Sequence, residues 1–160
     1  MSLDAVFCDC FKKGNVRTPP PQPALVYVEE TTGQVLFRWD APDADQHRFY
    51  DWLASACEHG PMGELVSLRL GNIALIAFLR ELFGKTPSQF PILLSKVVYN
   101  GVHGGDRLDL QDVERLATEM DSVHALHCLD PNEEELLRKF EAQMLDLIRA
   151  ARSVGRPIVF

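Results

Sequence analysis

Residues 24–40, ALVYVEETTGQVLFRWD, contain two β-strand patterns joined by a Thr-Thr-Gly turn. Gly33 can take the positive φ that such a short connection requires. In the second arm Val35, Phe37 and Trp39 alternate with residues that point the other way, which is typical of a half-buried antiparallel strand. We therefore expect a hairpin over 24–40, with Trp39 on the same face as Val35 and Phe37.

The rest of the chain predicts a single α+β domain over residues 1–160. We expect a mainly antiparallel sheet with about four helices packed on it. The expected strands are an N-terminal strand, the hairpin 24–40, strands near 65–70 and 92–99, and a short terminal strand or plug over 158–160. The helix starts are marked by residues suited to N-capping, at Asp43 (with Gln46 at N3), Asn72, Asp109 and Asp130 (with Pro131 at N1).

Composition and charge exclude several classes of protein. The chain has 160 residues, 46% hydrophobic and 24% charged, with a formal net charge of −7. The acidity is even when counted in blocks of forty residues, so we expect neither a nucleic-acid nor a membrane partner. No segment resembles a signal peptide, and the longest apolar run, residues 73–79, is far too short to span a bilayer. We expect a cytoplasmic protein whose four cysteines are unbridged thiols.

The segment from Tyr99 to Asp106 is the first candidate site. It follows the strand expected near 92–99 and precedes a helix, where α/β sheets tend to bind ligands. Tyr99, Asn100, His103 and Asp106 are the candidate ligand- or partner-binding residues. His103 could act as a general base oriented by Asp106, but no nucleophile motif accompanies this pair. The alternative is an ordinary glycine-rich turn whose polar residues satisfy backbone groups.

Metal binding is the second hypothesis. The candidate ligands are Cys8, Cys10, His124, His127 and Cys128. Zinc usually binds two Cys-x2–4-Cys or equivalent knuckles, and this spacing matches no such template. We therefore expect buried thiols, ordinary loop histidines, no metal and no cofactor.

Three segments carry a family resemblance. They are Leu70-Gly71-Asn72 entering an apolar helix, Phe90-Pro91-Ile92-Leu93-Leu94, and Asn100-Gly101-Val102-His103-Gly104-Gly105-Asp106 before an amphipathic helix. Together they resemble small bacterial α+β proteins, some of which are immunity proteins of polymorphic toxin systems. The resemblance implies a non-enzymatic protein that binds and neutralises a toxin domain, with no catalytic residues to carry over.

These observations predict a non-enzymatic protein-binding domain of the immunity type. One alternative is a small hydrolase-type enzyme that uses His103 and Asp106. The other is a self-associating structural domain in which Ile158, Val159 and Phe160 pack across a homodimer.

Overall fold

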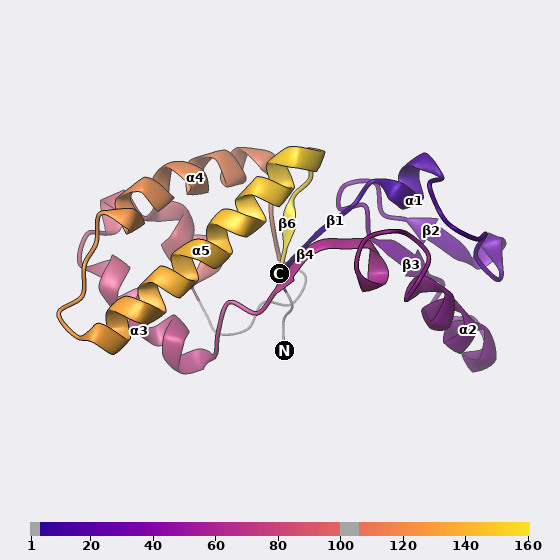
Figure 1. Ribbon diagram of the computed structural model, residues 1–160, viewed down its shortest axis with the longest axis horizontal. Coiled ribbons are helices and arrows are strands. Elements are labelled where there is room, and N and C mark those ends of the chain that lie inside the picture. The colour runs from indigo at the N-terminus through magenta and orange to yellow at the C-terminus, as the bar shows by residue number, and fades with distance from the viewer. Residues whose placement is uncertain (1–3, 100–105) are drawn as a thin grey trace.

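The computed structural model describes residues 4–99 and 106–160 and confirms the α+β fold class (Figure 1). A four-stranded antiparallel sheet has the order β4-β1-β6-β5, and a two-stranded sheet pairs β2 with β3. The strands are β1 (Asp4–Phe7), β2 (Val26–Val28), β3 (Val35–Phe37), β4 (Glu64–Leu68), β5 (Arg107–Leu108) and β6 (Ile158–Val159).

The helices fall into two groups. Three long helices, α3 (Ile73–Gly84), α4 (Leu110–His124) and α5 (Pro131–Val154), pack with the four-stranded sheet to form the part that we call the helical lobe. Two shorter ones, α1 (Cys10–Lys13) and α2 (Asp43–Leu53), lie with β2 and β3 in the N-terminal lobe, which spans residues 8–63. In the part of the chain that the structure describes, no helix is both long and apolar enough to cross a membrane.

The sequence-predicted caps of the three long helices are confirmed. The side chains of Asn72, Asp109 and Asp130 each accept a hydrogen bond from a backbone N–H in the first turn of the helix that follows. In α2 the predicted cap is displaced by one position, since Asp43 is already helical. Gln46 instead donates from its amide to the carbonyl oxygen of Ala41 at 2.8 Å.

The strand predicted near 92–99 is wrong. This segment is helical, with a π-helical turn at Leu93–Val97. A short apolar run cannot be assigned to strand or helix by its periodicity alone. Here the buried carboxylate of Glu119 accepts hydrogen bonds from the backbone N–H groups of Ile92 and Leu93, at 2.7 and 2.9 Å. This contact caps the helical turn from α4, far away in the sequence.

The two lobes differ greatly in the size of their cores. The helical lobe holds the main hydrophobic cluster, to which β1 contributes Val6 and the chain terminus contributes Ile158 and Phe160. The terminal plug that the sequence predicts is therefore confirmed, as strand β6. The N-terminal lobe has one small cluster around Val35 and Phe49, and a second that consists mainly of cysteines.

The hairpin is present but shorter than expected. Its ladder runs over Val26–Val28 and Val35–Phe37, and the chain then turns before α2. Trp39 lies in this turn and is 91% exposed, so it does not share the buried face of Val35. The alternation therefore ends one residue pair earlier than the sequence pattern suggests.

Candidate metal centre

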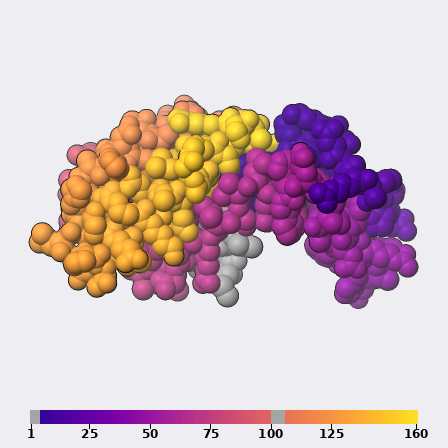
Figure 2. Space-filling model, in the orientation of Figure 1, coloured from indigo at the N-terminus to yellow at the C-terminus, as the bar shows by residue number. Residues whose placement is uncertain are grey.

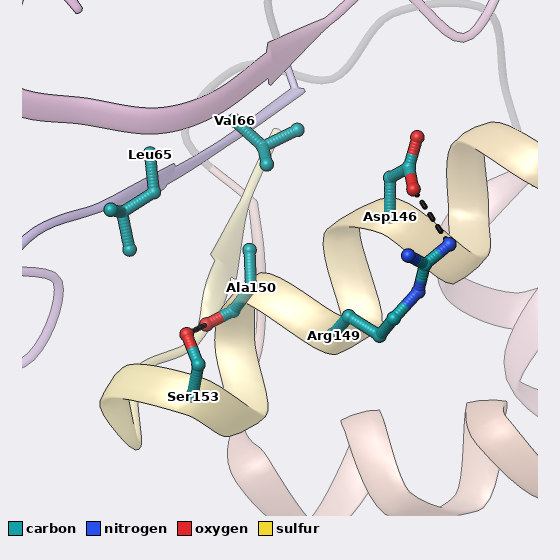
Figure 3. A pocket seen from close by; sticks show the side chains of 6 residues that line it. All are labelled: Leu65, Val66, Asp146, Arg149, Ala150 and Ser153. Atoms are coloured by element: carbon teal, nitrogen blue, oxygen red, sulfur yellow. Dashed lines mark hydrogen bonds and ion pairs between the residues drawn. The ribbon is translucent and has the colours of Figure 1, made fainter. Parts of the chain in front are cut away.

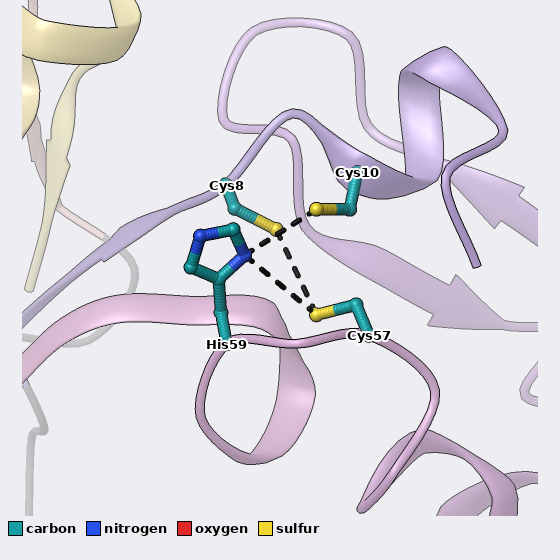
Figure 4. A group of neighbouring side chains, drawn as sticks. All are labelled: Cys8, Cys10, Cys57 and His59. Atoms are coloured by element: carbon teal, nitrogen blue, oxygen red, sulfur yellow. Dashed lines mark hydrogen bonds between the residues drawn. The ribbon is translucent and has the colours of Figure 1, made fainter. Parts of the chain in front are cut away.

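Three cysteines and one histidine meet at the junction of β1 and α1 with residues 57–59 (Figure 4). The ligating atoms of Cys8, Cys10, Cys57 and His59 all lie within 4.8 Å of one another. The sulfur atoms of Cys8 and Cys57 are 4.0 Å apart. The imidazole Nδ1 of His59 is 3.3 Å from the sulfur of Cys10 and 4.0 Å from that of Cys57.

These distances fit a tetrahedral zinc site. Zinc binds thiolate sulfur at about 2.3 Å and imidazole nitrogen at about 2.0–2.1 Å, so ligand atoms around one ion are separated by about 3.5–3.8 Å. A disulfide needs two sulfur atoms at about 2.05 Å. The 4.0 Å between Cys8 and Cys57 is too long for a disulfide and is close to the spacing of two ligands of one ion. All four cysteines have unbridged thiols, as the sequence predicts.

Backbone hydrogen bonds hold the two halves of the centre together. The N–H of Cys8 donates to the carbonyl oxygen of Gly63 at 2.8 Å, which ties the end of β1 to the segment that carries Cys57 and His59. Gly63 has a φ of +77°, and a Cβ there would lie 2.5 Å from the ring of Phe11. Only glycine fits this close approach without a shift of the ring.

The sulfur atoms sit in an apolar setting. Cys8, Cys10 and Cys57 are buried and pack with Phe11 and Leu65. Burial raises the pKa of the Cys8 thiol to about 12, and burial is also the main cause of the raised pKa of Cys10. A bound divalent cation reverses this preference, because its charge stabilises the thiolate form.

An ion pair anchors the Cys8-Asp9-Cys10 segment to the end of the chain. Arg156 is buried, with an exposed fraction of 4%, and its Nε donates to the carboxylate of Asp9 at 2.7 Å. The same guanidinium donates to the backbone carbonyl oxygens of Glu30 and Thr31 at 3.0 and 3.3 Å. Arg156 is the main cause of the lowered pKa of Asp9. One side chain thus connects the cysteine segment, the hairpin turn and the residues after α5.

A solvent cavity of about 440 Å³ lies beside the centre and is lined by three of its four side chains. Its wall includes Cys8, Cys10 and His59 on one side and Ser153 and Val154 of α5 on the other. The centre can therefore be reached from solvent on one side, as the entry of an ion requires.

The structure separates the metal candidates that the sequence singled out. Cys8 and Cys10 come together, whereas the other three lie in the helical lobe beside α5. Nδ1 of His124 is 2.7 Å from Glu141, and Nδ1 of His127 is 3.4 Å from Glu134. The N–H of Cys128 donates to Glu134 at 2.7 Å.

Cys57 and His59 are missed by the sequence reasoning. In the part of the chain that is described, these two residues with Cys8 and Cys10 form the one group of three or more metal-ligating side chains. Cys57-Glu58-His59 repeats the one-residue spacing of Cys8-Asp9-Cys10, and this repeat is the signal that could have identified the centre.

The segment from Tyr99 to Asp106 is only partly described. Asn100 and His103 lie outside the described residues. The hydroxyl of Tyr99 donates to the carboxylate of Asp106, and both residues line a cavity of about 240 Å³ with Lys96. The predicted role of these residues in ligand or partner contact stays a prediction.

Another cavity, of about 430 Å³, lies between β4 and α5 (Figure 3). Its polar side chains already have partners within α5. Asp146 pairs with Arg149 at 2.8 Å, and the hydroxyl of Ser153 donates to the carbonyl oxygen of Ala150 at 2.8 Å. The cavity therefore has fewer polar side chains available to bind a ligand than the cysteine centre has.

Comparison of the chain with protein-family models, with curated proteins and with solved structures finds no match.

Proposed function

We propose that this chain is a zinc-binding protein in which Cys8, Cys10, Cys57 and His59 form a structural Cys3His centre. One observation carries the proposal: four ligating atoms from two distant segments lie within 4.8 Å of one another. Three thiolates and one imidazole are a common ligand set of structural zinc sites. Four protein ligands leave no open position for a substrate, so the centre supports a structural role for the ion.

The small core of the N-terminal lobe suggests that the ion stabilises this lobe. The fully packed side chains of its larger cluster are only Val35, Phe49 and Leu53. Segments of this size are only marginally stable on their apolar core alone, and many natural ones add a metal or disulfides. A zinc ion at the cysteine cluster would connect the end of β1 to residues 57–59. It would thereby link the start of the N-terminal lobe to its end.

We further propose that the protein acts in the cytoplasm as a non-enzymatic binding protein. Neutralisation of a toxin domain, as in bacterial immunity proteins, is the specific form of this proposal. Reduced cytoplasmic thiols suit a thiolate centre. The alternatives of a hydrolase that uses His103 and Asp106, or of a homodimer closed by residues 158–160, stay open predictions.

The test is metal analysis of the purified full chain after growth with added zinc and dialysis against metal-free buffer. We expect one zinc per chain in the wild type and in Cys128→Ser, which removes the cysteine outside the centre. Cys57→Ser should lose the zinc, whereas His59→Cys should retain it because thiolate replaces imidazole. Cobalt substitution should give the visible absorption of a tetrahedral thiolate site in the wild type. The same absorption should be absent from Cys57→Ser.

Three results would contradict the proposal. They are a wild-type chain without zinc, a different metal at one per chain, and a Cys57→Ser variant that keeps its zinc. His59→Cys is the control for misfolding. It changes a ligand but should preserve the centre, so loss of zinc in Cys57→Ser alone would reflect loss of a ligand.

A further inference from the structure

We propose that hydrogen peroxide oxidises Cys8 and Cys57 to a disulfide, and that formation of this disulfide expels the zinc ion. The inference adds a redox response to the proposed zinc centre and rests on that proposed function. We call Cys8 and Cys57 the oxidisable pair.

The spacing of the sulfur atoms favours this pair. The sulfur atoms of Cys8 and Cys57 are 4.0 Å apart, although the two residues are 49 positions apart in the chain (Figure 4). A disulfide has a sulfur–sulfur distance of about 2.05 Å, so the two atoms must approach each other by about 2 Å. The sulfur of Cys10 has a different close neighbour, Nδ1 of His59 at 3.3 Å.

The backbone allows Cys57 to make this movement. Cys8 is held in place, because its N–H donates to the carbonyl oxygen of Gly63 at 2.8 Å and β1 ends just before it. Residues 57–59 lie outside the helices and strands, and within the described chain they make no backbone hydrogen bond. Cys57 can therefore move towards Cys8 without breaking a helix or a strand pairing.

The cavity beside the centre gives the oxidant a route to Cys8. The N-terminal lobe forms one end of the molecule (Figure 2), and the cavity of about 440 Å³ lies where this lobe meets α5 of the helical lobe. Cys8 and Cys10 line this cavity, whereas Cys57 does not. A molecule as small as hydrogen peroxide therefore meets Cys8 before it meets Cys57.

The two thiolates supply the electrons for the reaction. Cysteine that binds zinc is in the thiolate form, which is also the nucleophilic form. The sulfur of Cys8 attacks one peroxide oxygen, so an S–O bond forms, the O–O bond breaks and hydroxide leaves. The thiolate of Cys57 then attacks the sulfur of the resulting sulfenic acid, so the S–S bond forms, the S–O bond breaks and a second hydroxide leaves. Two electrons have then passed from the two thiolates to the peroxide.

The disulfide removes half of the ligands of the ion. Only Cys10 and His59 would remain, whereas a structural zinc site has four protein ligands. The ion is therefore released. The disulfide still connects the end of β1 to Cys57, so the oxidised chain loses its metal and keeps the connection that the metal made.

The test uses the zinc-loaded full chain carrying Cys128→Ser, which removes the thiol outside the centre. A small excess of hydrogen peroxide is added, and the released zinc is followed with a chromogenic chelator against a sample without peroxide. We expect release of the zinc together with the loss of two of the three remaining thiols. Dithiothreitol with added zinc should restore both the thiols and the bound ion.

Mass spectrometry identifies the bridged pair. A protease that cleaves before aspartate separates Cys8 from Cys10, because Asp9 stands between them. In the oxidised chain we expect the peptide that ends at Cys8 to be joined to the peptide that contains Cys57.

Two variants with the same ligand set provide the matched comparison. Cys57→His and Cys10→His each create a Cys2His2 set, which also suits structural zinc. Both should hold one zinc before oxidation, but only Cys10→His keeps the oxidisable pair. Peroxide should therefore release zinc from Cys10→His and leave it bound in Cys57→His. If either variant fails to bind zinc, the peptide map of the Cys128→Ser chain decides the question by itself.

Three results would overturn the inference. They are retention of zinc after peroxide treatment, a disulfide that includes Cys10, and equal release from Cys57→His and Cys10→His. The metal content before oxidation separates these results from the zinc proposal. A chain that holds one zinc before and after peroxide keeps the zinc centre and refutes its redox response. A chain that never holds zinc but still forms the bridge between Cys8 and Cys57 refutes the zinc centre and leaves the oxidisable pair standing.

Discussion

Replacement of Arg156 by methionine should destabilise the protein by about 3–4 kcal/mol. Methionine keeps an unbranched chain of similar reach but removes the charge. Truncating one partner of a buried ion pair costs about 3–5 kcal/mol. Asp9 is about one-quarter exposed and keeps Lys13 at 3.1 Å, so we reduce this part to about 2–3 kcal/mol. The lost hydrogen bonds to the carbonyl oxygens of Glu30 and Thr31 add about 1 kcal/mol.

The assay is urea unfolding of the full chain at saturating zinc, with the slope of the transition compared between variants. Arg156→Lys retains the charge without the fork of donors, and we expect it to cost about half as much as methionine. A double-mutant cycle with Asp9→Asn measures the pairwise part. A loss below about 1 kcal/mol for Arg156→Met, or equal losses for methionine and lysine, would refute the argument that this side chain joins the lobes.

Two further predictions concern carboxylates in the helical lobe. Glu119→Ala leaves two backbone N–H groups without their acceptor and should cost about 2–4 kcal/mol, whereas Glu119→Gln keeps one acceptor and should cost about half; equal urea midpoints would contradict this. For Glu134, the hydrogen bond from the N–H of Cys128, followed by that from Arg138, lowers the pKa from 4.5 to about 2. Its contribution to stability is therefore complete above pH 4.5 and is lost as the pH falls towards 2. Glu134→Gln should flatten the dependence of the urea midpoint on pH in this range, and an unchanged profile would show that the carboxylate does not matter.

The features predicted correctly from the sequence are those decided by near neighbours. Asn72, Asp109 and Asp130 each cap a helix through an N–H two or three residues later, so the pattern and the contact lie together in the chain. The buried face of α5 likewise repeats at helical spacing along the chain, with Leu137, Phe140, Met144, Leu147 and Ile148.

The features that were missed depend on distant contacts. The carboxylate of Glu119 caps the helical turn in residues 92–99. Nothing in the local sequence indicates that this distant carboxylate will lie there. Cys8 and Cys10 were recognised as a pair, but His59 joins them only once β1 pairs with β4. Trp39 fits the alternation of the hairpin, but β3 ends at Phe37. The chain then turns towards the start of α2 at Asp43.

The position of β1 between β4 and β6 has a consequence for synthesis on the ribosome. Ala5 pairs with Val159, and the main core includes both Val6 and Phe160. Residues 4–159 must therefore all leave the exit tunnel before the first strand gains its second neighbour. Until then the apolar side chains of β1 depend on β4 alone for cover. Chaperones that hold nascent chains would meet this protein with its central strand half paired.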